Sequence, residues 1–187
     1  LGLRWRITDD LNLIAGVFQL TSPYFSLDEA DVFRELGQLR NRGIEVSLSG
    51  SLTPALAVNI GALLLDPAVR GPAVDQGLVG PRAVFGIARN VEAALDWRPP
   101  FLQEFSFDVA FSHRSPEMAT VNNRVEIPTR NLVALGARHF FKIDEKEALL
   151  RVQIENLFDK QGFELIDENA FQLLWPRRIL AYLTIDF

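Results

Sequence analysis

Residue types that commonly carry catalysis or bind metals are few in this chain and are not grouped. The chain has no cysteine, and its two histidines, His113 and His139, are not spaced as a pair of metal ligands. Asp28, Glu29 and Asp31 form an acidic run. That run lacks the glycine turn and the closing glutamate of an EF-hand loop. We therefore predict no catalytic site, no resident metal and no cofactor, in a protein that is not an enzyme.

Side chains suited to binding a planar or oxygen-rich ligand flank two of the longer connections. Aromatic rings offer flat contact area, and arginines pair with carboxylate and other anionic oxygens. The same residue types also form the aromatic girdle of a membrane protein, where arginines meet lipopolysaccharide phosphates. The sequence leaves both explanations open for the candidate ligand-binding residues, which are Tyr24, Phe25, Phe33, Trp175, Arg177 and Arg178.

Composition narrows the classes of protein that this chain can represent. It has 187 residues, is 48% hydrophobic and carries a formal net charge of -5. This length suits one domain, and the mild acidity without a basic face predicts no nucleic-acid partner. No uncharged apolar run reaches about 18 residues, which excludes a helical membrane span and leaves transmembrane strands open. The only methionine is Met118 and no signal peptide is visible, so we expect Leu1 to lie inside a longer polypeptide.

Apolar and polar residues alternate along much of the chain, which predicts β-strands with one apolar and one polar face. A helical period of 3.6 residues would scatter the same apolar positions around an axis. The alternating segments are 44–52, 56–64, 91–97, 105–112, 150–155 and 179–187, and 11–24 and 131–143 fit with breaks. Three segments exceed the usual strand length of about five or six residues, namely 36–52, 123–143 and 147–163.

The connections between these segments alternate between short and long. Short turns are expected at residues 8–10, 53–55, 98–102 and 144–147, and long connections at 25–34, 66–83, 116–124 and 163–174. Outer-membrane barrels have short periplasmic turns and longer extracellular loops. The pattern therefore predicts an all-β fold whose antiparallel strands run up and down, as in a transmembrane β-barrel.

The alternation also assigns each residue to a face. One set is expected on the convex, lipid side: Ile44, Val46, Phe105, Phe107, Val152, Ile154, Ile179, Ala181, Leu183, Ile185 and Phe187. A second set is expected on the concave, luminal side: Glu45, Ser47, Asp108, Arg151, Gln153 and Glu155. Arginine at the middle of the lipid face would cost about 2–4 kcal/mol, so the charged set must face inward in a membrane barrel.

Four segments, in this order, resemble landmarks of TonB-dependent siderophore receptors. The first is Arg42-Gly43-Ile44-Glu45-Val46-Ser47-Leu48-Ser49-Gly50 with Leu52-Thr53-Pro54, and the second is Leu63-Leu64-Leu65-Asp66. The third is Val152-Gln153-Ile154-Glu155-Asn156-Leu157-Phe158-Asp159-Lys160, and the fourth is Trp175-Pro176-Arg177-Arg178 before the final strand. None is specific alone, but the ordered set covers nearly the whole chain. Ile185 departs from the family's frequent tyrosine near its end.

This resemblance implies a barrel of about 22 strands with a plugged lumen, of which residues 1–187 form the C-terminal portion of about eight or nine strands. The plug and the TonB-contacting segment, the TonB box, are then absent from this chain. It further implies a receptor that imports ferric siderophores by TonB-coupled active transport in the cell outer membrane of a Gram-negative bacterium. The implied partners are a ferric siderophore, the TonB system, outer-membrane lipid and lipopolysaccharide, and the barrel assembly machinery, for which the terminal Phe187 is part of the signal.

Two other functions stay open from the sequence. One is a small complete outer-membrane barrel that acts as a passive porin or anchor, which would need an even number of strands. The other is a soluble β-sandwich that binds carbohydrate or protein. A receptor portion should form a single curved sheet with neighbours paired in sequence order and two open edges, whereas a sandwich requires two sheets packed face to face.

Overall fold

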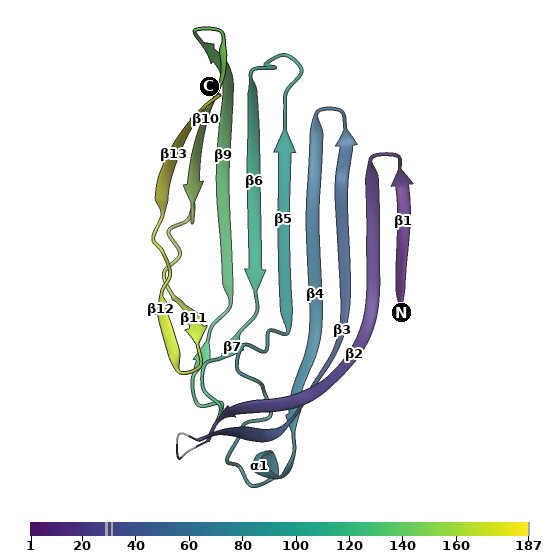
Figure 1. Cartoon of the computed structure of the whole chain (residues 1–187), viewed down its shortest axis with the longest axis vertical. Helices are drawn as coiled ribbons and strands as arrows, with labels where there is room; N and C mark the ends of the chain where they lie inside the picture. The colour runs from purple at the N-terminus through teal and green to yellow at the C-terminus, as the bar shows by residue number, and fades with distance from the viewer. Residues whose placement is uncertain (29, 31, 187) are drawn as a thin grey trace.

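The computed structural model of the chain describes residues 1–28, 30 and 32–186, and within them nine strands form one antiparallel sheet (Figure 1). The strands pair in the order β1-β2-β3-β4-β5-β6-β9-β10-β13. Their bounds are Gly2–Thr8 (β1), Leu11–Leu27 (β2), Phe33–Thr53 (β3), Leu56–Arg70 (β4), Arg89–Trp97 (β5), Phe105–Arg114 (β6), Arg130–Ile143 (β9), Lys146–Glu155 (β10) and Arg178–Ile185 (β13). Neighbouring strands of this sheet are consecutive in the chain or separated only by a hairpin in a loop, as predicted.

The short and long connections lie at opposite ends of the sheet (Figure 1). Short turns join β1 to β2, β3 to β4, β5 to β6 and β9 to β10 at one end, which confirms the predicted alternation. The long connections at the other end contain the helix α1 (Pro72–Asp75) and two ribbons, β7 (Glu117–Met118) with β8 (Glu126–Ile127), and β11 (Phe163–Asp167) with β12 (Ala170–Leu173). We call this the loop end.

The sheet is open, and no second large sheet covers it. Strands β1 and β13 are its edges in the described part of the chain, and the two further sheets there have two strands each. The expectation of an open trough is confirmed, and the sandwich alternative is wrong for this fold. A small closed barrel is likewise not what these residues form. No helix in the part of the chain that the structure describes is long and apolar enough to cross a membrane.

Several sequence-based boundaries are wrong. Strand β10 ends at Glu155 instead of continuing to 163, because Asn156 takes a positive φ of 49° and starts a turn. Phe158 therefore leaves the strand face and is 75% exposed. The expected strand over 123–143 is interrupted between β8 and β9. The first long connection is shorter than expected, since β2 and β3 remain paired as far as Leu27 and Phe33. Strand β3 has 21 residues, which confirms its unusual length.

Cross-strand pairing separates the two faces as the alternation predicts. Ile44 lies between Val17 and Leu64, and the next apolar rungs follow at every second residue. The other predicted lipid-side residues of the described chain lie on the same face, and Phe187 lies outside the described residues. Along β4 this face is apolar from Leu56 to Leu64, roughly 26 Å at about 3.3 Å per residue. That length is of the order of the roughly 25 Å apolar band of outer-membrane barrels.

The polar face lies on the inside of the curve. A hollow of about 380 Å³ on this face is lined by residues of four consecutive strands, including Ile14, Ser47, Gly61 and Glu92. On this face the Arg138 side chain of β9 also reaches across β6 to Asp96 of β5, as side chains do where a sheet curves towards them. The apolar face is the outer one, where Ile179 is 70% and Leu183 57% exposed. Exposed apolar side chains also occur on this face in β3 and β10, at Ile44 and Val152, and such a surface suits contact with lipid or another protein.

Polar residues mark where the apolar outer face ends towards the loop end. One rung beyond Ile44 and Leu64, the same face carries Gln19, Arg42 and Asp66. Arg42 donates from Nε to Oε1 of Gln19 at 2.7 Å. Strands β2 and β3 remain paired past this rung as far as Leu27 and Phe33, so they extend well beyond the apolar band.

Aromatic rings gather on the outer face near the short-turn end. The rings of Phe105 and His139 stack with centroids 4.3 Å apart, and His139 also stacks on Phe141 at 5.0 Å. Trp97 contacts Phe107 with centroids 6.1 Å apart. This arrangement gives His139 a packing role within a band of rings, which is typical of the aromatic girdle of a membrane barrel.

A chain of charged and amide side chains crosses the polar face from β5 to β13. Arg138 on β9 pairs with Asp96 and, at 3.2 Å, with Asp108 of β6. Asp108 also pairs with Arg151 of β10 at 3.3 Å. From there Arg151 donates to Gln153, Gln153 to Glu155, and Arg178 of β13 to Glu155 at 2.6 Å. The predicted luminal residues of these strands thus satisfy one another's charges and hydrogen bonds.

Gly136 makes room for this network. It lies opposite Asp108 in the β6–β9 ladder, and a Cβ at this position would lie 2.5 and 2.6 Å from the two carboxylate oxygens. The Asp108 carboxylate therefore lies over the bare backbone of β9, between Arg138 and Arg151. Only glycine leaves the carboxylate in that place.

Candidate functional site

The candidate site lies at the loop end, where all four long connections meet. Strands β2 and β3 bend across this end in Figure 1 towards the β11–β12 ribbon. The pairing of β2 with β3 shifts at a β-bulge, where Tyr24 faces Gly37 and Phe25 faces Glu35. Leu36 is the extra residue of β3 at this bulge, and its side chain is buried. Gly37 is required beside it, because a Cβ there would lie 2.5 Å from the carbonyl oxygen of Arg70.

Tyr24 is the predicted site residue that the fold buries. It is 8% exposed and packs in a cluster with Leu36, Val69, Val79 and Ala83. Its hydroxyl oxygen accepts a hydrogen bond from the N–H of Val84 at 3.4 Å. The ring therefore fastens the connection between β4 and β5 onto the inner side of the β2–β3 ribbon.

Phe25 and Phe33 lie on the opposite side of the same ribbon. Their rings stack with centroids 5.8 Å apart and an interplanar angle of 22°. Both are exposed, at 51% and 68%. The structure thus brings these two predicted residues together as one aromatic surface, on the face that does not carry Tyr24.

Trp175, Arg177 and Arg178 are brought together at the start of β13. The guanidinium carbon of Arg178 lies 5.0 Å from the Trp175 ring centroid, and Trp175 is 62% exposed. The N–H of Arg177 donates to Asp159 at 2.9 Å. Asn156 donates to the carbonyl oxygen of Trp175 at 2.9 Å. The Asn156–Asp159 segment is therefore the turn that positions these three residues.

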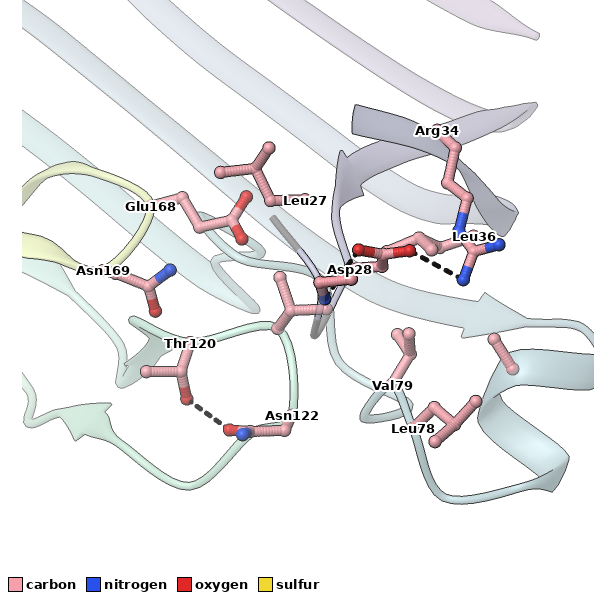
Figure 2. A pocket seen from close by; sticks show the side chains of 13 residues that line it. Leu27, Asp28, Arg34, Leu36, Leu78, Val79, Thr120, Asn122, Glu168 and Asn169 are labelled. Atoms are coloured by element: carbon pink, nitrogen blue, oxygen red, sulfur yellow. Dashed lines mark hydrogen bonds and ion pairs between the residues drawn. The ribbon is translucent and has the colours of Figure 1, made fainter. Parts of the chain in front are cut away.

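A cavity of about 310 Å³ lies between the long connections (Figure 2). It is bounded by the β2–β3 ribbon, the end of α1, the segment before β8 and the tip of the β11–β12 ribbon. Its polar lining includes Asp28, Arg34, Thr120, Asn122, Glu168 and Asn169, and its apolar lining includes Leu27, Leu36, Leu78, Val79 and Val121. The six predicted site residues do not line this cavity.

Asp28 organises the side of the cavity formed by β2 and β3. Its Oδ1 accepts hydrogen bonds from the N–H groups of Val32 at 2.9 Å and Ala30 at 2.8 Å, and its Oδ2 pairs with Arg34 at 2.7 Å. The N–H of Val32 foremost, with the N–H of Ala30 and the Arg34 guanidinium, holds the pKa of this carboxyl below its usual value. The other two acidic residues of the run, Glu29 and Asp31, lie outside the described residues.

The β11–β12 ribbon forms the other side of the cavity. At its tip, Glu168 accepts a hydrogen bond from the hydroxyl of Ser26 on β2. The neighbouring Asn169 donates its N–H to the carbonyl oxygen of Ala119 at 2.9 Å. These two contacts hold the tip between β2 and the segment that carries β7.

A buried ion cluster lies beneath this ribbon. Glu117 is 1% exposed and pairs with Arg130 at 3.5 Å and with Arg114 at 3.6 Å. Arg130, which is 8% exposed, also pairs with Glu164 of β11 at 3.2 Å. Burying these charges is tolerable because each has a partner of opposite sign. The cluster fixes β7, β9 and β11 relative to one another.

Among the cavity residues, the sequence drew attention only to Asp28, as part of an acidic run. Glu168 and Thr120 lie in stretches without period or motif, and their proximity arises from pairing across the whole sheet. The described residues contain no group of three or more His, Cys, Asp or Glu side chains that could hold a metal ion. The groups that line the cavity can recognise a ligand through hydrogen bonds, charge and apolar contact.

The chain is similar in sequence to one curated relative, the ferrichrome receptor FcuA of Yersinia enterocolitica. The two are 23% identical over 177 residues, which is 92% of this chain and 23% of the relative. A comparison with models of known protein families gives no match. The chain thus spans about a quarter of the length of the relative that it matches.

Solved structures of siderophore receptors have the same fold. The ferric preacinetobactin receptor BauA of Acinetobacter baumannii superposes with a TM-score of 0.83 at 23% identity, over 100% of this chain and 28% of that one. The ferric yersiniabactin uptake receptor FyuA of Yersinia pestis gives 0.79 at 16% identity, over 100% and 29%. The siderophore receptor PiuA of Acinetobacter baumannii gives 0.80 at 17% identity, over 99% and 28%.

The arrangement of the nine strands is thus shared with a part of each of these receptors. The chain has the fold of part of the β-barrel of TonB-dependent siderophore receptors, as the resemblance of its sequence landmarks indicates.

Proposed function

We propose that this chain forms part of the wall and outer mouth of an outer-membrane receptor that imports ferric siderophores by TonB-coupled active transport. The observation that carries the proposal is the similarity to a ferrichrome receptor along 92% of the chain, combined with the shared fold. The polar inner face and apolar outer face suit a strand wall between lipid and an aqueous or plugged lumen. Transport of this kind is binding followed by movement of a partner, so no reaction is catalysed.

Residues 1–187 supply the C-terminal portion of the barrel in this proposal. The plug and its TonB-contacting segment belong to other parts of the polypeptide, in keeping with the share of 23–29% of the relatives' length that the chain matches. The loop end is then extracellular and the short turns face the periplasm. Outer-membrane lipid, lipopolysaccharide and the barrel assembly machinery are the expected surroundings and partners.

The six predicted site residues are proposed as ligand contacts at the extracellular mouth. Exposure favours Phe25, Phe33 and Trp175, whose rings offer flat surfaces, and the guanidinium of Arg178 lies beside Trp175. Tyr24 would act indirectly in this role, since its ring is buried under the β4–β5 connection. Arg177 lies next to Arg178 and is held by the preceding turn.

Growth under iron limitation tests the proposed transport. A strain lacking the full-length parent gene should lose growth on one or more ferric siderophores from a broad panel, and the intact gene should restore it. Restoration should fail in a host without TonB. Unchanged iron uptake across the panel, together with lost uptake of a sugar or cobalamin, would contradict the siderophore assignment.

Paired variants test the proposed contacts. Trp175→Ala in the full-length receptor should weaken ferric siderophore binding, because the ring is offered to the ligand. Phe158→Ala is the matched control, since Phe158 is exposed in the same connection, at 75% against 62% for Trp175, but is not a proposed contact. If both variants and the unmodified receptor bound the ferric siderophore with equal affinity, Trp175 would not be a ligand contact.

A further inference from the structure

The cavity at the loop end has walls of two kinds. Leu36, Leu78, Val79 and Val121 give it an apolar side, whereas the β11–β12 tip and Asp28 give it a polar side. Its volume of about 310 Å³ is at the lower limit of common ligand pockets, which measure about 300–1,000 Å³. It therefore suits one arm of a larger molecule that has an alkyl stem and a polar head.

The only basic side chain among the described residues that line the cavity is already paired. Arg34 contacts Oδ2 of Asp28 at 2.7 Å, and both oxygens of Asp28 are engaged by Arg34 and by the backbone N–H groups. The lining that the structure describes therefore offers no free cation to an anionic oxygen. Its formal charge, from Asp28, Arg34 and Glu168, is negative.

Glu168 is the acidic residue of the lining whose carboxylate can still accept hydrogen bonds. Its Oε2 accepts from the hydroxyl of Ser26, its Oε1 has no hydrogen-bond partner, and the carboxylate forms no ion pair with a described residue. Figure 2 shows the carboxylate extending from the ribbon tip towards Leu27 and Asp28, across the cavity. A partly buried carboxylate without a cation can still pair with one that enters the cavity.

We propose that this cavity binds a protonated alkylamine arm of the ferric chelate, with Glu168 as the acceptor and the apolar wall around the alkyl stem. The inference rests on the proposed function for the identity of the carrier, but the ammonium chemistry follows from the cavity itself. It distinguishes cationic, donor-bearing chelates from wholly anionic ones at this position. No covalent step is involved.

The test uses the full-length receptor, purified in detergent at about 150 mM salt so that exposed charges are screened. The probes are a linear trihydroxamate ferric chelate with a free terminal pentylamine, the same chelate with that amine acetylated, and pentylamine alone. Binding is followed by quenching of tryptophan fluorescence or by competition. The receptor should bind the free amine form at least about tenfold more tightly than the acetylated form, a difference of about 1.4 kcal/mol.

Two variants test whether the preference for the free amine chelate arises in the cavity. Glu168→Gln retains the size of the side chain and removes its charge, so the ratio should fall below about twofold. Glu126→Gln removes a carboxylate at the same end that pairs with Arg82 outside the cavity, and it should leave the ratio unchanged.

Equal binding of the two chelates by the unmodified receptor would overturn the inference and leave siderophore uptake standing. A ratio that survives Glu168→Gln would overturn it as well. If no ferric chelate bound but pentylamine bound in a Glu168-dependent manner, the cavity chemistry would hold and the proposed function would fail.

Discussion

Substituting Gly136 by alanine should destabilise the barrel through a residue on the neighbouring strand. The new Cβ would lie 2.5 Å from Oδ2 of Asp108, so the carboxylate must move by about 1 Å to reach an ordinary contact. Its pairs with Arg138 at 3.2 Å and Arg151 at 3.3 Å would then both be lost. The effect therefore acts through the side chain of Asp108 and its two ion pairs.

The size of the effect follows from how far these charges are exposed. The side chains of Asp108, Arg138 and Arg151 are 19%, 24% and 33% exposed, which places each pair above a surface ion pair of about 0.2–1 kcal/mol. We expect the loss of both pairs to cost about 2 kcal/mol. Replacing glycine restricts the unfolded chain and returns about 0.4–1 kcal/mol, so the net loss is about 1–1.5 kcal/mol.

Gly61 on the same face provides the matched control. A Cβ at Gly61 would meet nothing within 4 Å, so Gly61→Ala should be neutral or slightly stabilising. Both variants would be measured by guanidinium unfolding of the full-length receptor in lipid vesicles, with tryptophan fluorescence as the signal. A double-mutant cycle with Asp108→Ala should abolish the cost of Gly136→Ala. The reasoning is refuted if the two alanine variants unfold alike, or if the cost persists without the Asp108 carboxylate.

Three further predictions concern the faces and the loop end. Val152→Arg, on the outer face, should cost about 2–4 kcal/mol in vesicle unfolding, whereas Gln153→Arg on the inner face should cost much less; similar costs would contradict the assigned faces. Tyr24→Ala should leave the barrel folded but speed proteolysis within 71–88, because the ring anchors that connection; unchanged cleavage would argue against the anchor. The lowered pKa of Asp28 means that its ordering of the Val32 amide is fully present above about pH 3.8 and is lost as pH falls through the lower folded-state value. The hydrogen-exchange protection of Val32 should accordingly drop in acid, and Asp28→Ala should lack that protection already at pH 6; a variant with full protection at pH 6 would refute this.

The sheet was predictable because its alternation is a local property. Every second residue of β13 from Ile179 to Ile185 is apolar and implies a face without reference to any other strand, with Leu180 on the polar face as the exception. The alternation of short and long connections then fixed the up-and-down order. These two signals depend only on neighbours in the chain, so a single sequence contains them.

The loop end was less predictable, because its contacts join distant parts of the chain. Glu168 contacts Ser26, which is 142 positions away, and no motif marks either residue. The strand end at Glu155 was missed because the positive φ of Asn156 depends on its side-chain bonds to Lys160 and Trp175. Tyr24 was named for its aromatic ring, but the bulge beside it decides that the ring is buried.

The bond between Ser26 and Glu168 has a mechanical consequence. It joins a strand next to one edge of the sheet to the ribbon that leads into the other edge, and the Asn169–Ala119 bond fastens the same tip to the middle. Hairpins of an up-and-down sheet should otherwise be extracted one at a time when a single molecule is pulled by its end. Here a pull on the last hairpin is transmitted across the mouth to β2. The first force peak should therefore report rupture of the Ser26–Glu168 bond, before any strand leaves the sheet.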